Sequence, residues 1–270
     1  MRGLLFLACL LWPSLVFAQT KFVMVDVGEG QTVFFQVGPK AILIDPGPVN
    51  KASLVLERLK AHGVVDLQVV VVTHPHPDHA SAYFRIKEAF PKAKIYHNCI
   101  QLQEGQRVPV MRWLVDDLAK NKNAACLGQG QKFVWQGFHF SALWPPKAPQ
   151  RHINDHSIVL FAQFNGVTAL LMADASSAVE RQLLKNWKAG PVDLYIAGHH
   201  GAKDTGLKAW LRLIQPQWSL ISVDKHNYYG YPSQAVMKKL NKASTNVRST
   251  SKAGEVCLNL DKKPLKLCKD

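Results

Sequence analysis

The sequence lacks any apolar run after residue 18 that is long enough to span a bilayer. It also lacks a low-complexity linker and any internal repeat of fixed period. These absences argue against a multispanning membrane protein and against a solenoid of stacked repeats. The 270 residues are instead enough to bury a substantial core in one or two packed domains.

Charge is scarce at the very start of the chain, where Arg2 is the only charged residue among residues 1–18. An apolar run from Leu4 to Leu11 follows, and Val16-Phe17-Ala18 ends in a small residue. This order is typical of a secretory signal peptide, so we expect residues 1–18 to be removed on export. An uncleaved N-terminal anchor is the alternative. We expect a secreted or periplasmic mature protein with no stable membrane span.

Cysteine is also scarce, and no two cysteines form a Cys-x-x-Cys pair, which disfavours a thiolate metal site. Four cysteines remain after residue 18, and an even number in an exported chain favours disulfides. We expect the pairs Cys99–Cys126 and Cys257–Cys268, which close the shortest loops.

Acidic residues are few, 19 against 33 lysines and arginines, and the formal net charge is +14. Such a surface attracts polyanions, among them nucleic acid, anionic cell-wall polymers and membrane surfaces. A charge that serves only solubility is the alternative. The sequence does not indicate an oligomeric state. Basic residues are densest near the C-terminus, at Lys238, Lys239, Lys242, Arg248, Lys252, Lys262, Lys263, Lys266 and Lys269.

Apolar runs of strand length alternate with amphipathic segments of helix length in both halves of the chain. Two such halves, with strands inside and helices outside, predict a single α/β domain over residues 19–270, a four-layer αββα sandwich. The expected strands are 22–27, 33–37, 41–44, 69–73, 94–96, 133–135, 138–143, 157–164, 168–172, 194–197, 218–223 and 256–260, with another near 247. The expected helices are 52–62, 81–90, 110–120, 178–187, 207–214 and 233–240.

A histidine-rich run follows the expected strand at 69–73 directly: His74, His76, Asp78 and His79 lie within six residues. Imidazole nitrogens and carboxylate oxygens are ligands of zinc-like divalent ions. Alternate residues share one face of an extended segment, so His74 and His76 can point to the same side. Asp78 and His79 then fall on the turn into the next helix and can face a second ion. A solvated His-rich loop is the alternative interpretation.

Two further strands end in groups of the same chemistry. Asp174 follows the run at 169–173, and His199 and His200 follow the run at 194–198. An aspartate after a strand is often only a helix N-cap. Together with the histidine-rich run, however, these residues predict a metal centre, with Asp174 placed to bridge two ions.

The order His74-x-His76-x-Asp78-His79, then Asp174, then His199-His200-Gly201 resembles the metallo-β-lactamase fold. The resemblance implies two divalent metal ions, zinc or manganese. His74 and His76 would bind one ion, Asp78 and His79 would bind the other with His199 or His200, and Asp174 would bridge. Of these two histidines, His199 is slightly favoured as the ligand because it directly follows Gly198. Asp45 matches the family's supporting aspartate, and Asp45, Asp78 and Asp174 are the expected catalytic residues.

Four further segments resemble the metallo-β-lactamase-type domain of the ComEC competence proteins and their secreted stand-alone relatives. They are residues 26–31, 154–160, 199–203 and 222–232. That domain is associated with degrading the non-transported DNA strand during uptake. The resemblance implies hydrolysis of a phosphodiester by a metal-activated water, with Lys203, Asn227 and Tyr231 as contacts to phosphate or base.

The chain departs from these relatives at two positions. Tyr231 stands where the branch usually has a histidine, which alters one substrate or metal contact. Asn154 stands where lactamases of this fold supply a metal-binding histidine, and His152 or His156 beside it could replace that ligand or contact substrate.

The fold hosts many reactions, so two other functions stay open. One is a hydrolase of a small or cell-wall substrate, such as a β-lactam, a lactone or a phosphocholine ester. The other is a catalytically weak module that binds DNA during uptake. Substrate binding by a nuclease should weaken steeply as the salt concentration rises, whereas substrate binding by a lactamase should hardly change.

Overall fold

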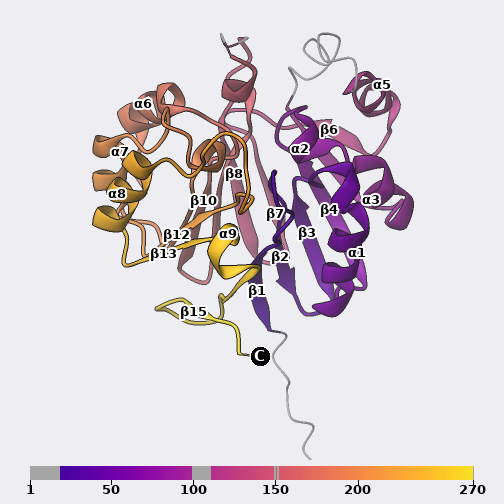
Figure 1. Cartoon of the computed structure of the whole chain (residues 1–270). Coiled ribbons are helices and arrows are strands. Elements are labelled where there is room, and N and C mark those ends of the chain that lie inside the picture. The colour runs from indigo at the N-terminus through magenta and orange to yellow at the C-terminus, as the bar shows by residue number, and fades with distance from the viewer. Residues whose placement is uncertain (1–18, 99–110, 149, 151, 270) are drawn as a thin grey trace, which may run out of the picture.

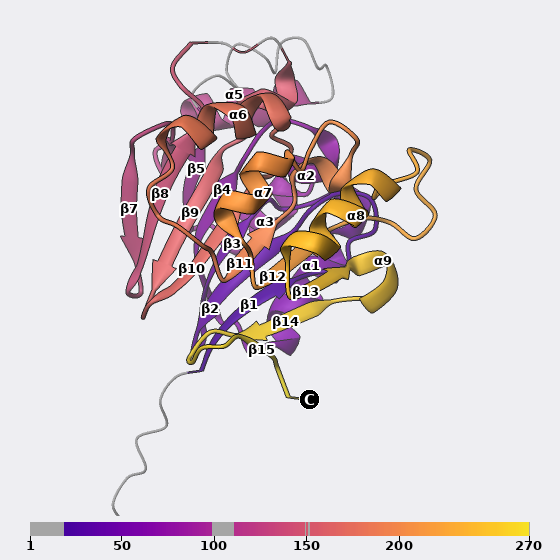
Figure 2. The same cartoon turned by 90° about the vertical axis from the view of Figure 1, so that its left-hand side faces the viewer.

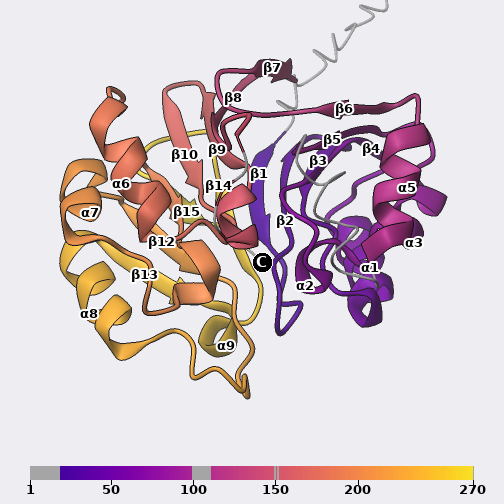
Figure 3. The same cartoon turned by 90° about the horizontal axis from the view of Figure 1, so that it is seen from above.

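The computed structural model describes residues 19–98, 111–148, 150 and 152–269, and the predicted signal peptide lies outside this part of the chain. Two β-sheets pack face to face, and helices cover the outer face of each (Figure 1). Seen from above, α1, α3 and α5 lie on one side of the paired sheets and α6, α7 and α8 on the other (Figure 3). The predicted four-layer αββα sandwich is confirmed.

The first sheet has eight strands in the order β15-β14-β1-β2-β3-β4-β5-β6. Its bounds are β1 Thr20–Met24, β2 Val33–Val37, β3 Lys40–Ile44, β4 Asp66–Val72, β5 Lys94–His97, β6 Ala124–Cys126, β14 Val256–Asn259 and β15 Lys266–Leu267. The second sheet has seven strands in the order β13-β12-β11-β10-β9-β8-β7. Its bounds are β7 Lys132–Trp135, β8 Phe138–Trp144, β9 Val159–Phe164, β10 Val167–Leu171, β11 Leu194–Ile196, β12 Trp218–Ile221 and β13 Asn246–Ser249.

Both faces of the central strands are buried, which explains why they read as continuous apolar runs. In β3, Ile42 and Ile44 enter the core between the sheets, whereas Leu43 packs under the helices. The same alternation occurs in β4 and in β10, where Leu170 faces the helices and Leu171 the inter-sheet core.

The helices cover these outer faces, as a view from the side of the second sheet shows for α6, α7 and α8 (Figure 2). Buried residues of α1, α3 and α5 form one outer core with the first sheet, and those of α6, α7 and α8 form another with the second. The α-helices are α1 Ala52–Ala61, α2 Pro77–Ala80, α3 Tyr83–Ala89, α5 Arg112–Lys120, α6 Ser177–Asn186, α7 Lys208–Ile214, α8 Gln234–Ala243 and α9 Thr250–Ala253. The 3₁₀ segments are η1 Val49–Lys51, η3 Ile153–His156 and η4 Gly198–Gly201.

Several short elements differ from the sequence predictions. The helix expected over 81–90 is α3, but a separate short helix, α2, precedes it from Pro77 and contains Asp78 and His79, which were expected on a turn. Proline is favoured at a first helical position, since its fixed φ suits the helix and its missing N–H is not needed there. The short strands β6 and β15 and the helix α9 were not expected. The start of the helix predicted at 110 lies outside the described residues.

The disulfide Cys257–Cys268 is present, and it joins β14 to the residue that follows β15. The predicted Cys99–Cys126 pair is not confirmed, because Cys126 is an exposed free cysteine and Cys99 lies outside the described residues. Within the part of the chain that the structure describes, no helix has the length and apolar character needed to cross a membrane.

The strand directions bring the predicted site residues to one edge. β3 and β4 are parallel, as are β10, β11 and β12. The carboxyl ends of parallel strands meet at the same edge, and in open α/β sheets ligands bind there. Asp45, the histidine-rich run, Asp174 and the histidine pair all follow such ends.

Candidate metal centre

One group of possible ligands consists of His74, His76 and Asp174, whose ligand atoms lie within 4.8 Å of one another. His74 and Asp174 are buried, and His74 Nε2 is 3.6 Å from Asp174 Oδ2. The two residues come from different sheets: His74 follows β4 and Asp174 lies three residues beyond β10. The group therefore exists only because the two sheets pack together.

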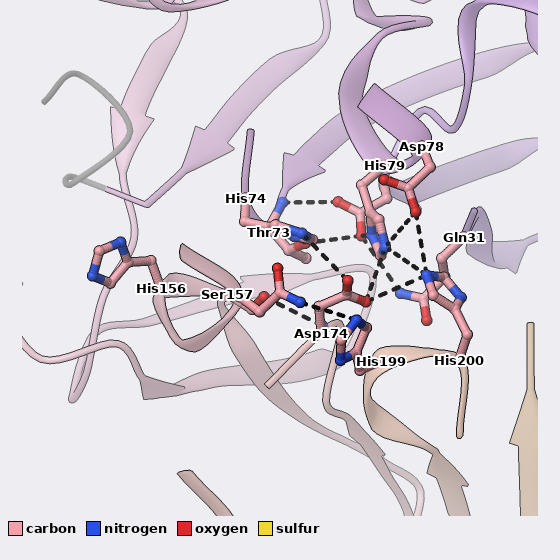
Figure 4. A network of polar contacts seen from close by, with 12 residues as sticks. Gln31, Thr73, His74, Asp78, His79, His156, Ser157, Asp174, His199 and His200 are labelled. Atoms are coloured by element: carbon pink, nitrogen blue, oxygen red, sulfur yellow. Dashed lines mark hydrogen bonds and ion pairs between the residues drawn. The ribbon is translucent and has the colours of Figure 1, made fainter. Parts of the chain in front are cut away.

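A second group consists of Asp78, His79 and His200. His200 Nε2 lies 3.3 Å from His79 Nε2 and 3.3 Å from Asp78 Oδ2. Asp174 reaches this group as well, because its Oδ1 is 3.0 Å from His79 Nε2 and 3.5 Å from His200 Nε2. Its two oxygens thus face different groups, as a bridging carboxylate requires (Figure 4).

Hydrogen bonds behind the cluster set the same tautomer on three of the histidines. His79 Nδ1 donates to Asp45 Oδ2 at 2.7 Å, and His200 Nδ1 donates to the Ser222 carbonyl at 2.8 Å. Thr73 Oγ1 gives its proton to Asp45, so it accepts from His74 Nδ1 at 3.1 Å. In the neutral form of each ring Nε2 carries no proton and faces the cluster, which is the arrangement of metal-binding histidines.

Asp45 lies behind the cluster, fully buried, and it does not line the cavity described below. Its Oδ1 accepts from the backbone N–H of Thr73 at 2.8 Å. Asp45 was expected to be catalytic; in the structure it contacts His79 and Thr73, so it can orient His79 and the start of the histidine-rich run, and it has no contact with the cavity. The related expectation of a supporting aspartate agrees with this geometry.

Burial and the neighbouring charges act in opposite directions on the pKa values of the cluster. Burial lowers the pKa of His74 well below its ordinary value and also lowers that of His76. Burial alone would lower the pKa of His79, but the carboxylates of Asp174, Asp78 and Asp45 outweigh it and raise that pKa. For Asp174, burial is outweighed by His79 and His200, which lower its pKa well below the ordinary value.

The donor set fits divalent cations. His74 Nε2 and Asp174 Oδ1 are buried and have no hydrogen-bond partner within the described residues. A buried polar atom without a partner is costly unless it binds something. The two groups offer imidazole nitrogen and carboxylate oxygen, the ligands that zinc and manganese share.

His200, and not the slightly favoured His199, joins Asp78 and His79. His199 Nε2 accepts a hydrogen bond from Asn154 Nδ2 at 3.1 Å, so the ring proton lies on Nδ1, 3.4 Å from Asp204 Oδ1. Both neighbouring histidines have positive φ, 46° for His199 and 51° for His200. This tight backbone turn sends the two rings in different directions, and the sequence carried no signal of which one enters the cluster.

The residues proposed to replace a missing ligand behave differently from one another. His152 is exposed and lines a smaller cavity beside His76. His156 is buried, but its Nε2 accepts from the backbone N–H of Gln150, and its ring lies apart from the cluster (Figure 4). Neither belongs to a ligand group in the described part of the chain. Asn154 does reach the centre, through its hydrogen bond to His199.

The cluster opens into a cavity of about 360 Å³. Two of the three predicted substrate contacts, Asn227 and Tyr231, line this cavity, whereas Lys203 is exposed outside it. The Asn227 amide is committed to its own loop: Nδ2 donates to the carbonyls of Asp224 and Tyr231. Asn227 therefore shapes the loop instead of offering free donors to a substrate.

Sequence reasoning missed several residues of the site. Thr73 was seen only as a strand end, although a hydroxyl directly before the run could have suggested a partner for His74. Ser222 lies in the segment 222–232 but was given no role of its own, because it contacts His200 through its backbone carbonyl. Glu29, Asp224 and Tyr229 also line the cavity and were not singled out.

Gly30 explains the glycine-rich turn before β2. Its φ is 125°, and a Cβ at this position would overlap the carbonyl oxygen of Asp78. The backbone of Gln31 also donates to that carbonyl at 3.3 Å. The turn thus packs directly on α2 and holds Asp78 in place, which only glycine permits.

Comparisons with curated proteins find a recombination protein, a ComE operon protein and a competence protein. Recombination protein 2 of Haemophilus influenzae is 27% identical over 239 residues, which cover 87% of this chain and 28% of that protein. ComE operon protein 3 of Bacillus subtilis is 23% identical over 254 residues, covering 86% of this chain and 32% of that protein. Competence protein ComA of Neisseria gonorrhoeae is 23% identical over 237 residues, covering 87% and 31%. The chain thus spans about a third of the length of these relatives.

Solved structures share the fold. The metallo-beta-lactamase fold protein YhfI of Bacillus subtilis has a TM-score of 0.56 at 16% identity, covering 86% of this chain and 96% of that one. A mutant of the CmlA beta-hydroxylase has a TM-score of 0.57 at 12% identity, covering 89% of this chain and 54% of that one. The family model of the metallo-beta-lactamase superfamily matches residues 25–223. The chain therefore belongs to the metallo-beta-lactamase superfamily.

Proposed function

We propose that the protein is an exported, metal-dependent phosphodiesterase that cleaves DNA. The observation that carries the proposal is the pair of ligand groups that share Asp174 at the bottom of an open cavity. A hydrolase with divalent metal ions is what the superfamily and these groups support. Cleavage of nucleic acid is the more specific part of the proposal.

The residues would divide the work between two cations. His74, His76 and Asp174 would hold one, and Asp78, His79 and His200 the other. Two bound divalent ions would lower the pKa of a water and clamp the attacking and leaving oxygens of a phosphodiester. The hydrogen bonds from His79 to Asp45 and from His200 to Ser222 keep the rings oriented without entering the cavity.

The charge of the cavity makes substrate binding depend on the metal. Four carboxylates line it, those of Glu29, Asp78, Asp174 and Asp224. Without cations these groups would repel a phosphodiester; with cations bound the cavity can attract it. The net charge of +14 favours an anionic polymer as substrate, and the similarity to a recombination protein and a competence protein makes DNA the first choice.

The experiment uses metal-stripped protein that is re-supplied with zinc or manganese singly. It is tested on single- and double-stranded DNA, a chromogenic phosphodiester and a chromogenic β-lactam. We expect phosphodiester cleavage that depends on the metal. With DNA as substrate, its rate should fall steeply as the salt concentration rises. The double variant His76→Ala/Asp78→Ala should be inactive, whereas His139→Ala, which removes an exposed histidine on β8, should match the parent.

Two outcomes would reject the proposal. In one, the double variant hydrolyses DNA as fast as the parent, so the activity does not come from this centre. In the other, no ion gives phosphodiester turnover while the β-lactam is hydrolysed. DNA binding that survives in the double variant, without turnover in the parent, would instead indicate a binding module.

Export is a separate part of the proposal. It is supported by the charge and apolar pattern of residues 1–18 and by the Cys257–Cys268 disulfide. N-terminal sequencing of the protein recovered outside the cytoplasm should start at Gln19. Recovery of the full-length chain from the cytoplasm alone would contradict export.

A further inference from the structure

The loop between β12 and α8 carries exposed aromatic rings beside the metal centre. Tyr228 is 94% exposed and Tyr229 is 62% exposed. Tyr229 and Tyr231 line the same cavity as Asp174 and His200. Large rings that stay in water at the edge of a polar cavity add no buried apolar area to the core. Their position there is explained if they contact a ligand.

This loop is held in one shape by its own hydrogen bonds. Asn227 Oδ1 accepts from the backbone N–H of Tyr231 at 2.7 Å, and its Nδ2 donates to the Tyr231 carbonyl at 2.7 Å. The backbone N–H of Ser233 donates to the Gly201 carbonyl at 2.9 Å, which ties the loop to the segment that carries His200. The loop backbone that carries the aromatic residues is thus tied to the segment of the metal ligands.

The rings are already arranged as a stack. Those of Tyr229 and Tyr231 have centroids 5.4 Å apart and planes 20° apart, and the Tyr231 and His199 ring centroids are 5.6 Å apart with the rings at 65°. Since Tyr231 contacts His199 and Tyr229 is largely exposed, the stack extends from the metal centre towards solvent. A further planar group could continue it on Tyr229.

We propose that Tyr229 and Tyr231 form a base-stacking subsite, which holds an unpaired nucleobase next to the phosphodiester at the metal centre. The inference rests on the proposed phosphodiesterase function and adds the substrate class: single strands. A base in a duplex is stacked and paired with its neighbours, whereas every unpaired base offers a free face to an aromatic ring. The subsite is therefore sequence-tolerant and selects against duplex.

The test compares Tyr229→Leu, which keeps an apolar side chain but removes the ring, with Tyr229→Trp, which keeps a stacking surface. The control is Trp113→Leu, which removes another exposed aromatic ring, on α5. KM and kcat are measured with a single-stranded oligonucleotide and with the same strand carrying abasic sites. Binding of both strands to the metal-loaded protein is measured by fluorescence anisotropy.

We expect Tyr229→Leu to raise KM for the intact strand roughly 5- to 100-fold, the range of one base stacked on an aromatic ring. Because stacking is present in ground and transition states alike, kcat should change little. Tyr229→Trp should restore the parent KM, Trp113→Leu should have no effect, and the abasic strand should be bound equally weakly by the parent and by Tyr229→Leu.

Failure of the subsite and failure of the function give different results. If the parent cleaves intact and abasic strands with the same KM, the subsite is wrong while the phosphodiesterase stands. If nothing is cleaved, but anisotropy shows a preference for intact strands that Tyr229→Leu loses, the subsite stands and the proposed function is rejected. Equal binding of both strands by the parent overturns the subsite in either case.

Discussion

Asp45 Oδ2 lies 2.7 Å from His79 Nδ1, and Thr73 donates to the same carboxylate oxygen. One fully buried carboxylate thus connects the second ligand group, through His79, with the first, through Thr73 and His74. The two groups are connected by a residue that does not line the cavity.

Asp45→Asn should therefore weaken metal binding without removing a ligand. An amide can offer its NH₂ group where His79 needs an acceptor, which favours the wrong tautomer of the ring. We expect affinity for zinc or manganese to fall about 10- to 100-fold. Calorimetric titration of the metal-stripped protein measures it, and Asp117→Asn, which alters a partly exposed aspartate on α5, is the control. Unchanged affinity would mean that the contact does not set the tautomer.

Asp174→Asn should affect both ligand groups, because Asp174 faces His74 with one oxygen and His79 with the other. We expect it to lower metal content, and activity on any substrate should fall by more than about 100-fold, beyond the usual effect of losing a residue behind the ligands. Metal analysis after gel filtration checks the first, and circular dichroism verifies the fold. Retention of full metal content would show that Asp174 is not a ligand.

The two adjacent histidines should differ. His200→Ala removes Nε2 from the group with Asp78 and His79, so the bound metal should fall by about one ion per chain. His199→Ala removes a ring whose Nε2 is occupied by Asn154, so metal content should stay as in the parent. Metal content measured for both variants shows which histidine is the ligand. If His199→Ala lost the ion and His200→Ala kept it, His199 would be the ligand instead.

Gly30→Ala should lower the free energy of unfolding because the alanine Cβ would overlap the Asp78 carbonyl. Gly63 is the control: its φ is also positive, at 78°, but a Cβ there meets nothing within 4 Å. Gly63→Ala should cost about 1–2 kcal/mol of unfolding free energy from backbone strain alone. Gly30→Ala should cost roughly a further 1–3 kcal/mol from overpacking and should also weaken metal binding. Chemical denaturation measures both, and equal costs would contradict the close approach.

Acid should weaken the fold at Glu255, which accepts hydrogen bonds from Arg58 at 2.7 and 2.8 Å and contacts His62 at 2.8 Å. Although burial opposes it, these partners lower the pKa of Glu255 to about 2 from an ordinary value of 4.5. The stabilisation is therefore complete above pH 4.5 and is lost as pH falls towards 2.

This contribution should amount to about 2 kcal/mol, less than the full shift implies because Arg58 is partly exposed. Unfolding free energies of the parent and Glu255→Gln, measured from neutral pH down to about pH 3, should differ most at neutral pH and converge in acid. A difference that stays constant with pH would show that the pair does not couple to protonation.

Much of the site could be predicted because it is local in the chain. His74, His76, Asp78 and His79 follow one buried strand, and their spacing alone places them at its carboxyl end. The central strands were recognised for the same reason, since burial of both faces leaves an apolar run. By contrast, β6 is only partly buried and β15 is exposed, and both were missed because their short segments carry no such pattern.

Other features depend on partners far away in sequence. Asn227 and Lys203 were expected to contact substrate, but the loop hydrogen bonds of Asn227 and the exposed position of Lys203 became visible only in the structure. The choice between His199 and His200 depends on Asn154 and Ser222, which approach them from other elements.

The order of residues along the chain already shows which side chains can bind a divalent cation and at which strand ends they lie. How those side chains are used depends on the packing of segments that are distant in the chain. Packing the two sheets against each other puts Asp174 within reach of both His74 and His79, and it buries Asp45 behind them. The physical reason is that ligand identity is a property of side chains, whereas ring orientation and tautomer are set by hydrogen bonds between distant segments.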